Sequence, residues 1–262
     1  MPKSERHIRL ERYILKYTNT SISLGSLEKD DAFKPYLMAP DYIIRYLRAF
    51  HICFDKDKTD ERLTIFYAWL KAVDSLIDNN KTDGMEYYKL FVEPENRHKN
   101  DLPSLLTVSL SICSHTQKSA LSKTLKSLYA VAIKEKRSKN IREYISRKRQ
   151  CGRLCATATV ELISDIAYFP DKRFYDFFND FGSTAQLMDA SIDFRNDQKN
   201  KEINFIPRPM DYLYLYSTLL KEMSCLIIKH LFILKGMPGF ILRLHKANNN
   251  TKKEQEAKKA GS

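Results

Sequence analysis

Two groups of aspartates have the spacing of residues that share one side of a helix. Asp74 and Asp78 lie one turn apart, and Asp189, Asp193 and Asp197 follow one another at intervals of four residues. Like charges at this spacing destabilise an isolated helix by roughly 0.2–0.5 kcal/mol per pair. A buried carboxylate cluster costs far more unless a cation compensates it, so a cation is expected. Carboxylate oxygens suit Mg²⁺, which commonly binds one or two carboxylates together with waters and phosphate oxygens.

The apolar residues around these aspartates predict that both helices border an interior cavity. On residues 60–79 the acids lie at the edge of a broad apolar arc, and on 172–199 apolar residues flank the acidic stripe on both sides. A separate polar stripe, which we expect to face solvent, consists of Asp180, Thr184, Ser191 and Arg195. The alternative is that the acidic stripes are ordinary solvated faces. Because the chain has a net charge of +12, an acidic stripe between apolar surfaces favours the metal-binding interpretation.

Composition and periodicity predict an all-α fold. Seven of the 262 residues are glycine, fewer than half of the usual ~7%. The sequence contains no glycine-rich dinucleotide motif and no P-loop. Hydrophobic residues make up 43% of the chain, which is enough for a sizeable core. Apolar residues at helical spacing predict helices over about 5–17, 40–54, 60–79, 84–92, 103–114, 117–136, 139–167, 172–199, 210–235 and 237–247.

Helix-start signals and the last residues of the chain define the expected domain. Pro40, Thr59 and Asp171 mark the beginnings of three helices. We assign residues 1–246 to a single helical domain and expect the charged residues 247–262 to form a disordered tail.

Cysteine usage favours a reducing, cytoplasmic location. The five cysteines form no C-x-x-C pair and the six histidines form no H-E-x-x-H motif, which argues against a disulfide framework and a zinc site. The first residues lack the apolar core of a secretory signal. Charged residues interrupt the most apolar stretch, 212–244, so a membrane-spanning helix is not expected there.

The excess of basic residues bears on the partners. Lysines are spread over many predicted helices and no nucleic-acid motif occurs, so we expect no nucleic-acid partner. Residues 225–246 mix bulky apolar and basic side chains, as helices that lie on a membrane surface do. A core helix with a basic edge is the alternative. Peripheral membrane contact of a cytoplasmic protein therefore stays open.

The two aspartate groups lie within longer motifs. Tyr67–Asp78 (Y-A-W-L-K-A-V-D-S-L-I-D) resembles the first aspartate-rich motif of squalene/phytoene synthases, which typically reads YA-aromatic-C-R-x-x-D-x-x-x-D. Gln186–Asp197 (Q-L-M-D-A-S-I-D-F-R-N-D) resembles their second motif, Q-L-x-N-x-x-x-D-x-x-x-D. In that family a basic segment and an aromatic-Leu-Pro follow, and here the corresponding residues are Lys199, Lys201, Phe205, Ile206 and Pro207.

This resemblance implies an all-α class I isoprenoid synthase with a central cavity. In that family the two acidic motifs face each other across the cavity and hold Mg²⁺ against an allylic diphosphate, whose departure leaves a carbocation. Carried over to this chain, the catalytic acids are Asp74, Asp78, Asp193 and Asp197. The same four acids and Asp189, which stands where phytoene synthases usually have Asn, would bind the metal.

Further site residues are expected around these acids. The substrate diphosphate would be bound by Lys71, Arg149, Arg153, Lys199 and Lys201, since cations pair with phosphate oxygens. The cavity would be lined by Phe50, Tyr67, Gly152 and Gln186, whose aromatic members could stabilise a carbocation. For the basic cluster at 147–153, an ordinary solvated helix face is the alternative, and we expect Cys151 and Cys155 to be small core residues.

Departures from the family pattern determine the order of the functional hypotheses. The N-terminal Ser-Phe-Tyr of the family has only a poor counterpart near Ser21, and its middle motif retains only Tyr144 and Gly152. Both are the family's supports for a second diphosphate. The first hypothesis is therefore cyclisation of one farnesyl or geranylgeranyl diphosphate, and head-to-head coupling of two is the second. A catalytically silent family member, acting as an assembly or binding factor, is the third. In each case we expect 60–79 and 172–198 to run antiparallel across the cavity.

Overall fold

The computed structural model describes residues 5–22, 24, 33–79, 81–94, 100–199 and 203–230. Within these ranges, nothing is described for the side chains of Lys34, Asp193, Asn196, Asp197 and Lys199. The helix expected over 237–247 and the tail expected over 247–262 lie outside the described residues.

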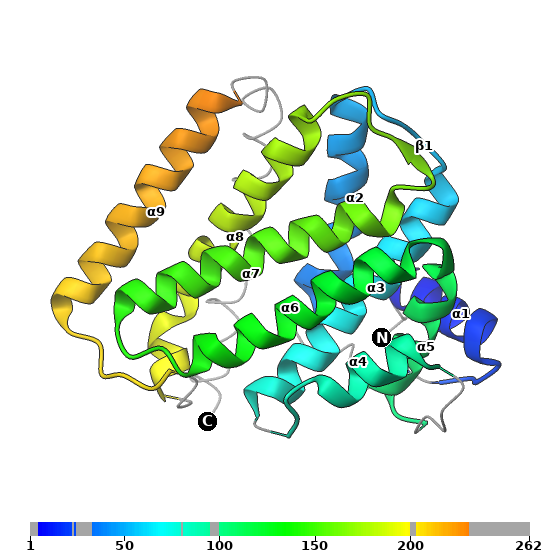
Figure 1. Cartoon of the computed structure of the whole chain (residues 1–262), viewed down its shortest axis with the longest axis horizontal. Coiled ribbons are helices and arrows are strands. Elements are labelled where there is room, and N and C mark those ends of the chain that lie inside the picture. Colours follow the sequence, from blue (N-terminus) through cyan, green and yellow to red (C-terminus); the bar gives the residue numbers. More distant parts are fainter. Residues whose placement is uncertain are drawn as a thin grey trace, which may run out of the picture.

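The described part of the chain is mostly helical, which confirms the all-α prediction (Figure 1). Its α-helices are α1 (Glu5–Thr18), α2 (Lys34–Ala49), α3 (Lys56–Asp78), α4 (Met85–Val92), α5 (Leu102–Cys113), α6 (Lys118–Lys136), α7 (Ile141–Ile163), α8 (Arg173–Lys199) and α9 (Pro209–Lys229). A short 3₁₀-helix, η2 (His115–Gln117), joins α5 to α6. Most of these bounds agree with the predicted ones to within a few residues.

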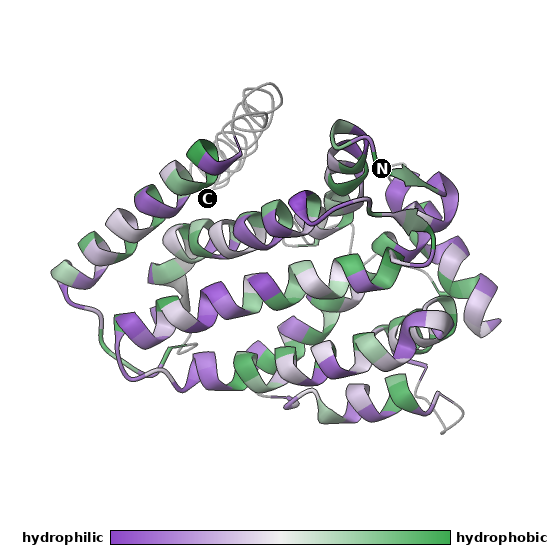
Figure 2. Cartoon of the chain, turned by 45° about the horizontal axis from the view of Figure 1, so that its top comes forward, coloured by the Kyte–Doolittle hydropathy of each residue, from purple (hydrophilic) through white to green (hydrophobic). Residues whose placement is uncertain are grey.

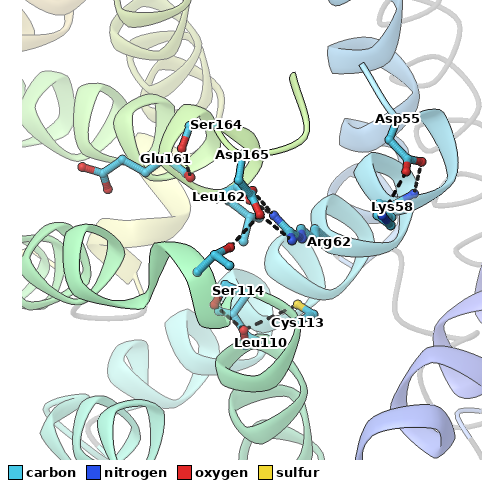
Figure 3. A network of polar contacts seen from close by, with 11 residues as sticks. Asp55, Lys58, Arg62, Leu110, Cys113, Ser114, Glu161, Leu162, Ser164 and Asp165 are labelled. Carbon is cyan, nitrogen blue, oxygen red and sulfur yellow. Dashed lines mark hydrogen bonds and ion pairs between the residues drawn. The ribbon is translucent and has the colours of Figure 1, made fainter. Parts of the chain in front are cut away.

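Two of the predicted helix starts are wrong. Pro40 lies inside α2, and Pro35 occupies its first turn, where a missing N–H removes no helical hydrogen bond. The helix α3 begins before Thr59 because Asp55 caps it: the Asp55 carboxylate accepts the N–H of Lys58 at 3.1 Å (Figure 3).

Two short strands replace the ends of two predicted helices. Strand β1 (Cys53–Phe54) pairs antiparallel with β2 (Ala167–Tyr168). Before β1, His51 has a φ of +54°, a left-handed conformation that cannot continue an α-helix. The strand pair joins the chain after α2 to the chain after α7, so both helices end earlier than their apolar periodicity predicts.

The helix α7 lies in the middle of the bundle, packed against α6 and α8 (Figure 1). It runs antiparallel to α3, because Arg62 near the start of α3 donates to the carbonyl oxygen of Leu162 near the end of α7 at 2.9 Å. It also runs antiparallel to α8, because Tyr144 near its start contacts the ring of Phe194 near the end of α8. The helices α3 and α8 therefore run in the same direction, and the antiparallel prediction is wrong.

Two glycines allow α7 and α8 to approach each other closely. A Cβ atom at Gly152 would overlap the carbonyl oxygen of Gly182, and one at Gly182 would overlap that of Gly152. Gly152 is thus a helix-packing residue at the α7–α8 crossing.

Polar contacts also fix α3 against α7. Arg62 forms an ion pair with Asp165, which follows α7, and Thr116 donates to the same carboxylate at 2.6 Å (Figure 3). Apolar residues fill the spaces between the helices, and α7 and α8 contribute to both of the larger clusters of buried side chains. Figure 2 shows polar and apolar residues interspersed along the helices. None of the described helices combines the length and apolarity that crossing a membrane requires.

Candidate functional site

A cavity of about 560 Å³ lies among α2, α3, α6, α7 and α8. Its charged lining residues are Lys71, Asp74, Asp78, Glu135, Lys136, Lys148 and Asp189. Its other lining residues are mostly aromatic or aliphatic. The cavity is therefore a mixed site, with acids and lysines set among apolar walls.

The acids of α3 are the first group in this site. Burial, and next the charge of Asp78, raises the pKa of Asp74 to about 7, while Lys148 and Lys71 lower it in part. Asp78 lies 3.7 Å from the ammonium group of Lys136 at the end of α6. Ionisation of Asp74 therefore costs free energy, because the carboxylate has lost water and is repelled by Asp78. A bound cation would offset both costs.

Lys71 and Tyr36 meet on the same side of the cavity. The Lys71 ammonium group lies over the Tyr36 ring, 5.7 Å from its centroid. Burial, followed by the charges of Asp74 and Asp189, raises the pKa of the Tyr36 hydroxyl. The electrostatic influence of acids from both α3 and α8 therefore reaches this tyrosine.

The helix α8 contributes Gln186 and Asp189 to the cavity. Asp189 is an exposed residue, so it stands at the rim of the cavity. Asp193, Asp197 and Lys199 belong to the last turns of α8, but their side chains lie outside the description, and Lys201 is outside the described residues altogether.

The polar stripe predicted to face solvent is partly covered by α9. Lys229 and His230 lie 3.2 Å and 3.3 Å from the carboxylate of Asp180. Tyr216 donates to the carbonyl oxygen of Ser191 at 3.2 Å, and Thr184 is buried. Expecting this stripe to be the solvent face of α8 was wrong, because α9 packs along it.

A third group comes from α6 and α7: Lys148 belongs to the basic cluster for which diphosphate capture and a solvated helix face were both open, and its pairing with Glu135 was not predicted. The Lys148 ammonium group lies 2.9 Å from a Glu135 carboxylate oxygen, and 5.6 Å from the centroid of the Tyr144 ring. Burial alone would lower the pKa of Lys148, but Glu135, Tyr144 and Asp189 raise it well above its ordinary value. Lys148 is thus a charged lysine inside the cavity, within electrostatic reach of both Asp74 and Asp189.

A helical pattern could have revealed this group. The residues that α7 contributes to the cavity are Tyr144, Lys148, Cys151 and Cys155, and their i, i+4, i+7, i+11 spacing is that of one helix face. A lysine between apolar residues on such a face is the available signal. The two cysteines line the cavity, and burial raises the pKa of the Cys155 thiol to about 12, so it is a poor nucleophile.

Aromatic residues of α3 form part of the wall and are fixed by hydrogen bonds. The Tyr67 hydroxyl is hydrogen-bonded to Thr159 Oγ1 at 3.0 Å, and the Trp69 indole N–H donates to Thr107 Oγ1 at 3.0 Å. Both residues line the cavity. Because the protein satisfies both polar atoms, only apolar ring surface remains for the wall. Trp69 is 1% exposed and supports the wall from the core, whereas Tyr67 is only partly buried.

Four predicted site residues lie elsewhere. Phe50 packs in the core against Phe174 and Phe177, with ring centroids 5.2 Å and 5.3 Å away, and Gly152 lies at the α7–α8 crossing. Arg149 forms an ion pair with Glu222 of α9. Arg153 is an exposed residue of α7 outside the cavity lining. These residues sit on the sides of their helices that face other neighbours.

The α3 acids are chemically suited to Mg²⁺. They are a turn apart, they line one cavity, and the pKa of Asp74 is raised by burial and by Asp78 in the absence of a cation. Among the residues that the structure describes, no three metal-ligating side chains converge on one point. Two carboxylates with waters and phosphate oxygens are nevertheless a common Mg²⁺ environment. The pair therefore fits a metal that a ligand phosphate helps to hold.

Comparisons of this chain with family models, with curated proteins and with solved structures give no match.

Proposed function

We propose that the chain is a Mg²⁺-dependent class I terpene synthase, which ionises an allylic prenyl diphosphate and cyclises it with release of diphosphate. The observation that carries the proposal is the presence of Asp74, Asp78 and Asp189 around one cavity with aromatic and aliphatic walls. This combination suits a ligand with a charged head and a long apolar chain.

The residues of the cavity divide into two chemical roles. Asp74 and Asp78 would hold Mg²⁺, which as a Lewis acid stabilises the negative charge of the leaving diphosphate. Lys71, Lys136 and Lys148 would pair with phosphate oxygens, and Tyr36 and Tyr67, with Trp69 behind them, would exclude water from the carbocation.

The size of the cavity supports one substrate in preference to two. A volume of about 560 Å³ lies within the range of roughly 300–1,000 Å³ that is usual for a single small-molecule ligand. Head-to-head coupling needs room and cations for a second diphosphate. Cyclisation therefore remains the leading hypothesis.

Incubation with farnesyl diphosphate and, separately, geranylgeranyl diphosphate tests the proposal. With Mg²⁺ and without NADPH, we expect diphosphate release and a hydrocarbon or alcohol with the carbon number of the substrate, identified by gas chromatography–mass spectrometry. Asp74→Asn and Asp78→Asn should each lower the rate of diphosphate release by at least about a hundredfold. Asp57→Asn, an exposed position on the same helix, is the matched control.

Three outcomes would contradict this assignment. Full activity in EDTA, or in the Asp74 and Asp78 variants, would exclude the metal role. Products of doubled carbon number would show head-to-head coupling.

A catalytically silent binding protein is the second candidate, and the ion pairs of the cavity favour it. Lys136 lies near Asp78, and Lys148 lies near Glu135, so lysines already compensate part of the acidic charge. Calorimetry with farnesyl thiodiphosphate, an analogue that ionises slowly, distinguishes the two candidates. Tight binding without any release of diphosphate from farnesyl diphosphate would establish the silent protein.

A further inference from the structure

The helix α9 has apolar residues on two sides, and among the described residues one of these sides packs against the bundle. Leu215, Leu219 and Leu226 are buried on the inner side, where α9 contacts α8 and α7. At 100° per residue the opposite side carries a second set of large side chains, here called the outer face. The large residues of the outer face are Met210, Leu213, Tyr214, Leu220 and Ile228, and the polar residues Ser217, Lys221 and Ser224 lie among them.

The outer face is exposed along the whole helix. Met210, Leu213, Leu220 and Ile228 are each 60–70% exposed. Figure 1 shows α9 at the edge of the bundle, and Figure 2 shows apolar residues recurring along it. Isolated exposed hydrophobic residues are ordinary, but several large ones on the same side of one helix mark a candidate binding surface, here interrupted by the exposed Ser217, Lys221 and Ser224.

Of the four charged residues of α9, only Lys221 lies on the outer face. The two acids of α9 are engaged elsewhere: Asp211 accepts the backbone N–H of Arg208 at 2.7 Å, and Glu222 forms an ion pair with Arg149. Lys221 lies on the outer face itself and is exposed. Near the start of α9, the guanidinium carbon of Arg142 lies 5.8 Å from the centroid of the Tyr214 ring. The patch is therefore apolar with a basic border.

We propose that the outer face of α9 docks the protein on an anionic membrane surface. An interfacial helix buries its apolar side chains at the level of the headgroups and keeps its lysines near the lipid phosphates. Tyrosine is favoured at that level as well. The sequence that follows α9, LFILKGMPGFILRLHK, continues the same mixture of bulky apolar and basic residues.

Two other occupants fit the surface less well. A helix of 21 residues is about 30 Å long, so its outer face is a narrow strip. Two such strips bury less than the roughly 1,200 Å² of a standard specific interface between two chains. Residues 231–262, which follow α9, also carry an excess of basic side chains. Electrostatic repulsion from Lys221 and Arg142 would therefore oppose packing of this segment on the outer face. An anionic bilayer matches both the apolar residues and the charge.

The proposal rests on α9 and not on the cavity, so its test needs no substrate. The full chain is mixed with large vesicles of phosphatidylcholine alone, or of phosphatidylcholine with phosphatidylglycerol, and the bound fraction is measured by flotation. We expect binding to the phosphatidylglycerol vesicles that weakens as salt is raised.

Variants of the outer face make the test specific. The double variant Leu213→Ser/Leu220→Ser should lower the partition constant about tenfold or more. Lys221→Glu should lower it about tenfold on anionic vesicles, because one lysine is lost and a negative charge is added. Leu15→Ser on α1 and Ile112→Ser on α5 are matched controls at other exposed apolar positions and should bind like the wild type.

Several results would overturn the proposal. One is the absence of vesicle binding, and another is binding that the double variant does not weaken. If the wild type does not bind vesicles but is a dimer by sedimentation equilibrium, and the double variant is a monomer, the outer face binds a second copy of the chain. If the wild type does not bind vesicles and the double variant has a markedly lower melting temperature, the outer face is covered by the segment that follows α9.

Discussion

The helices α3 and α8 carry similar acidic spacings in very different surroundings. Helix α3 is packed by α1, α2, α5 and α7, and Asp74 lies on it at the cavity wall with its pKa raised to about 7. Helix α8 contacts α7 and α9, and its Asp189 is exposed at the cavity rim. Equal spacing on a helix therefore does not give equal electrostatics, because the neighbouring helices determine how much water each carboxylate retains.

The contrast suggests a division of labour within the candidate site. Under the proposed function, the buried Asp74 would gain most from a divalent cation, the partly exposed Asp78 would share it, and the exposed Asp189 would meet a ligand as it enters. Lys148 is within electrostatic reach of both helices, since its charge affects Asp74 and is itself affected by Asp189. The following four predictions test this comparison.

The largest expected effect comes from separating α8 from α7. Gly152→Val places side-chain atoms where the carbonyl oxygen of Gly182 lies, so the helices must move apart. We expect a loss of about 3 kcal/mol in the free energy of unfolding, or a melting temperature lower by roughly 10 °C. Thermal unfolding followed by circular dichroism measures it. The exposed Gln150→Val on the same helix should be nearly neutral, and an equal loss there would refute the close-approach explanation.

The next effect is at the lysine between the two helices. Lys148→Met leaves the partly buried carboxylate of Glu135 without this ion pair. We expect a loss of about 2 kcal/mol in the free energy of unfolding, less than for a fully buried pair because some water reaches both groups. Urea unfolding at neutral pH is the measurement. Lys134→Met, an exposed position on α6, should unfold like the wild type, and a stable Lys148→Met protein would mean that the pair contributes little.

The third prediction concerns the pH dependence that Asp74 gives to stability. Its pKa is about 7 in the folded chain, above the ordinary 3.8. Between these values the folded state holds a proton that the unfolded state has released, so the contribution of Asp74 to stability falls as the pH rises. Asp74→Asn removes this loss and should be more stable than the wild type at pH 8, with the difference disappearing near pH 4. The full shift corresponds to about 4 kcal/mol, and we expect about 1–2 kcal/mol because Asp74 is only partly shielded from water.

Urea unfolding at a series of pH values tests this prediction. Asp57→Asn, at an exposed position of α3, is the control and should follow the wild-type profile. Identical pH profiles for the wild type and Asp74→Asn would mean that Asp74 is better solvated than its position implies.

The smallest effect expected is stabilisation by Mg²⁺ alone. When free Mg²⁺ is at ten times its Kd, binding should add about 1.4 kcal/mol to the free energy of unfolding. The increase in melting temperature should be larger at pH 8 than at pH 5.5, since protons compete for Asp74. Asp78→Asn should abolish the increase and Asp57→Asn should retain it. A normal response of Asp78→Asn would place any bound metal elsewhere.

The sequence by itself determined most of the helices and part of the cavity. Helical geometry fixes which residues share a face, so the acids of α3 and the pair Gln186 and Asp189 could be recognised from spacing alone. Lys71 and Tyr67 were found in the same way, and all of these residues line the cavity. The end of α2 and the start of α3 were less predictable, because the left-handed residue His51 and the capping residue Asp55, and not periodicity, decide where these helices end and begin.

Only the tertiary structure decided which neighbour each face meets. Lys148 and Arg149 are adjacent in the same basic run, yet the first enters the cavity and the second pairs with Glu222 of α9. Gly152 was expected at the cavity and instead allows α7 and α8 to touch. The shared direction of α3 and α8 follows from their both packing antiparallel to α7. Which neighbouring helix a side chain meets depends on contacts between residues far apart in the chain. The spacing of residues along the sequence shows only which of them share a side of one helix.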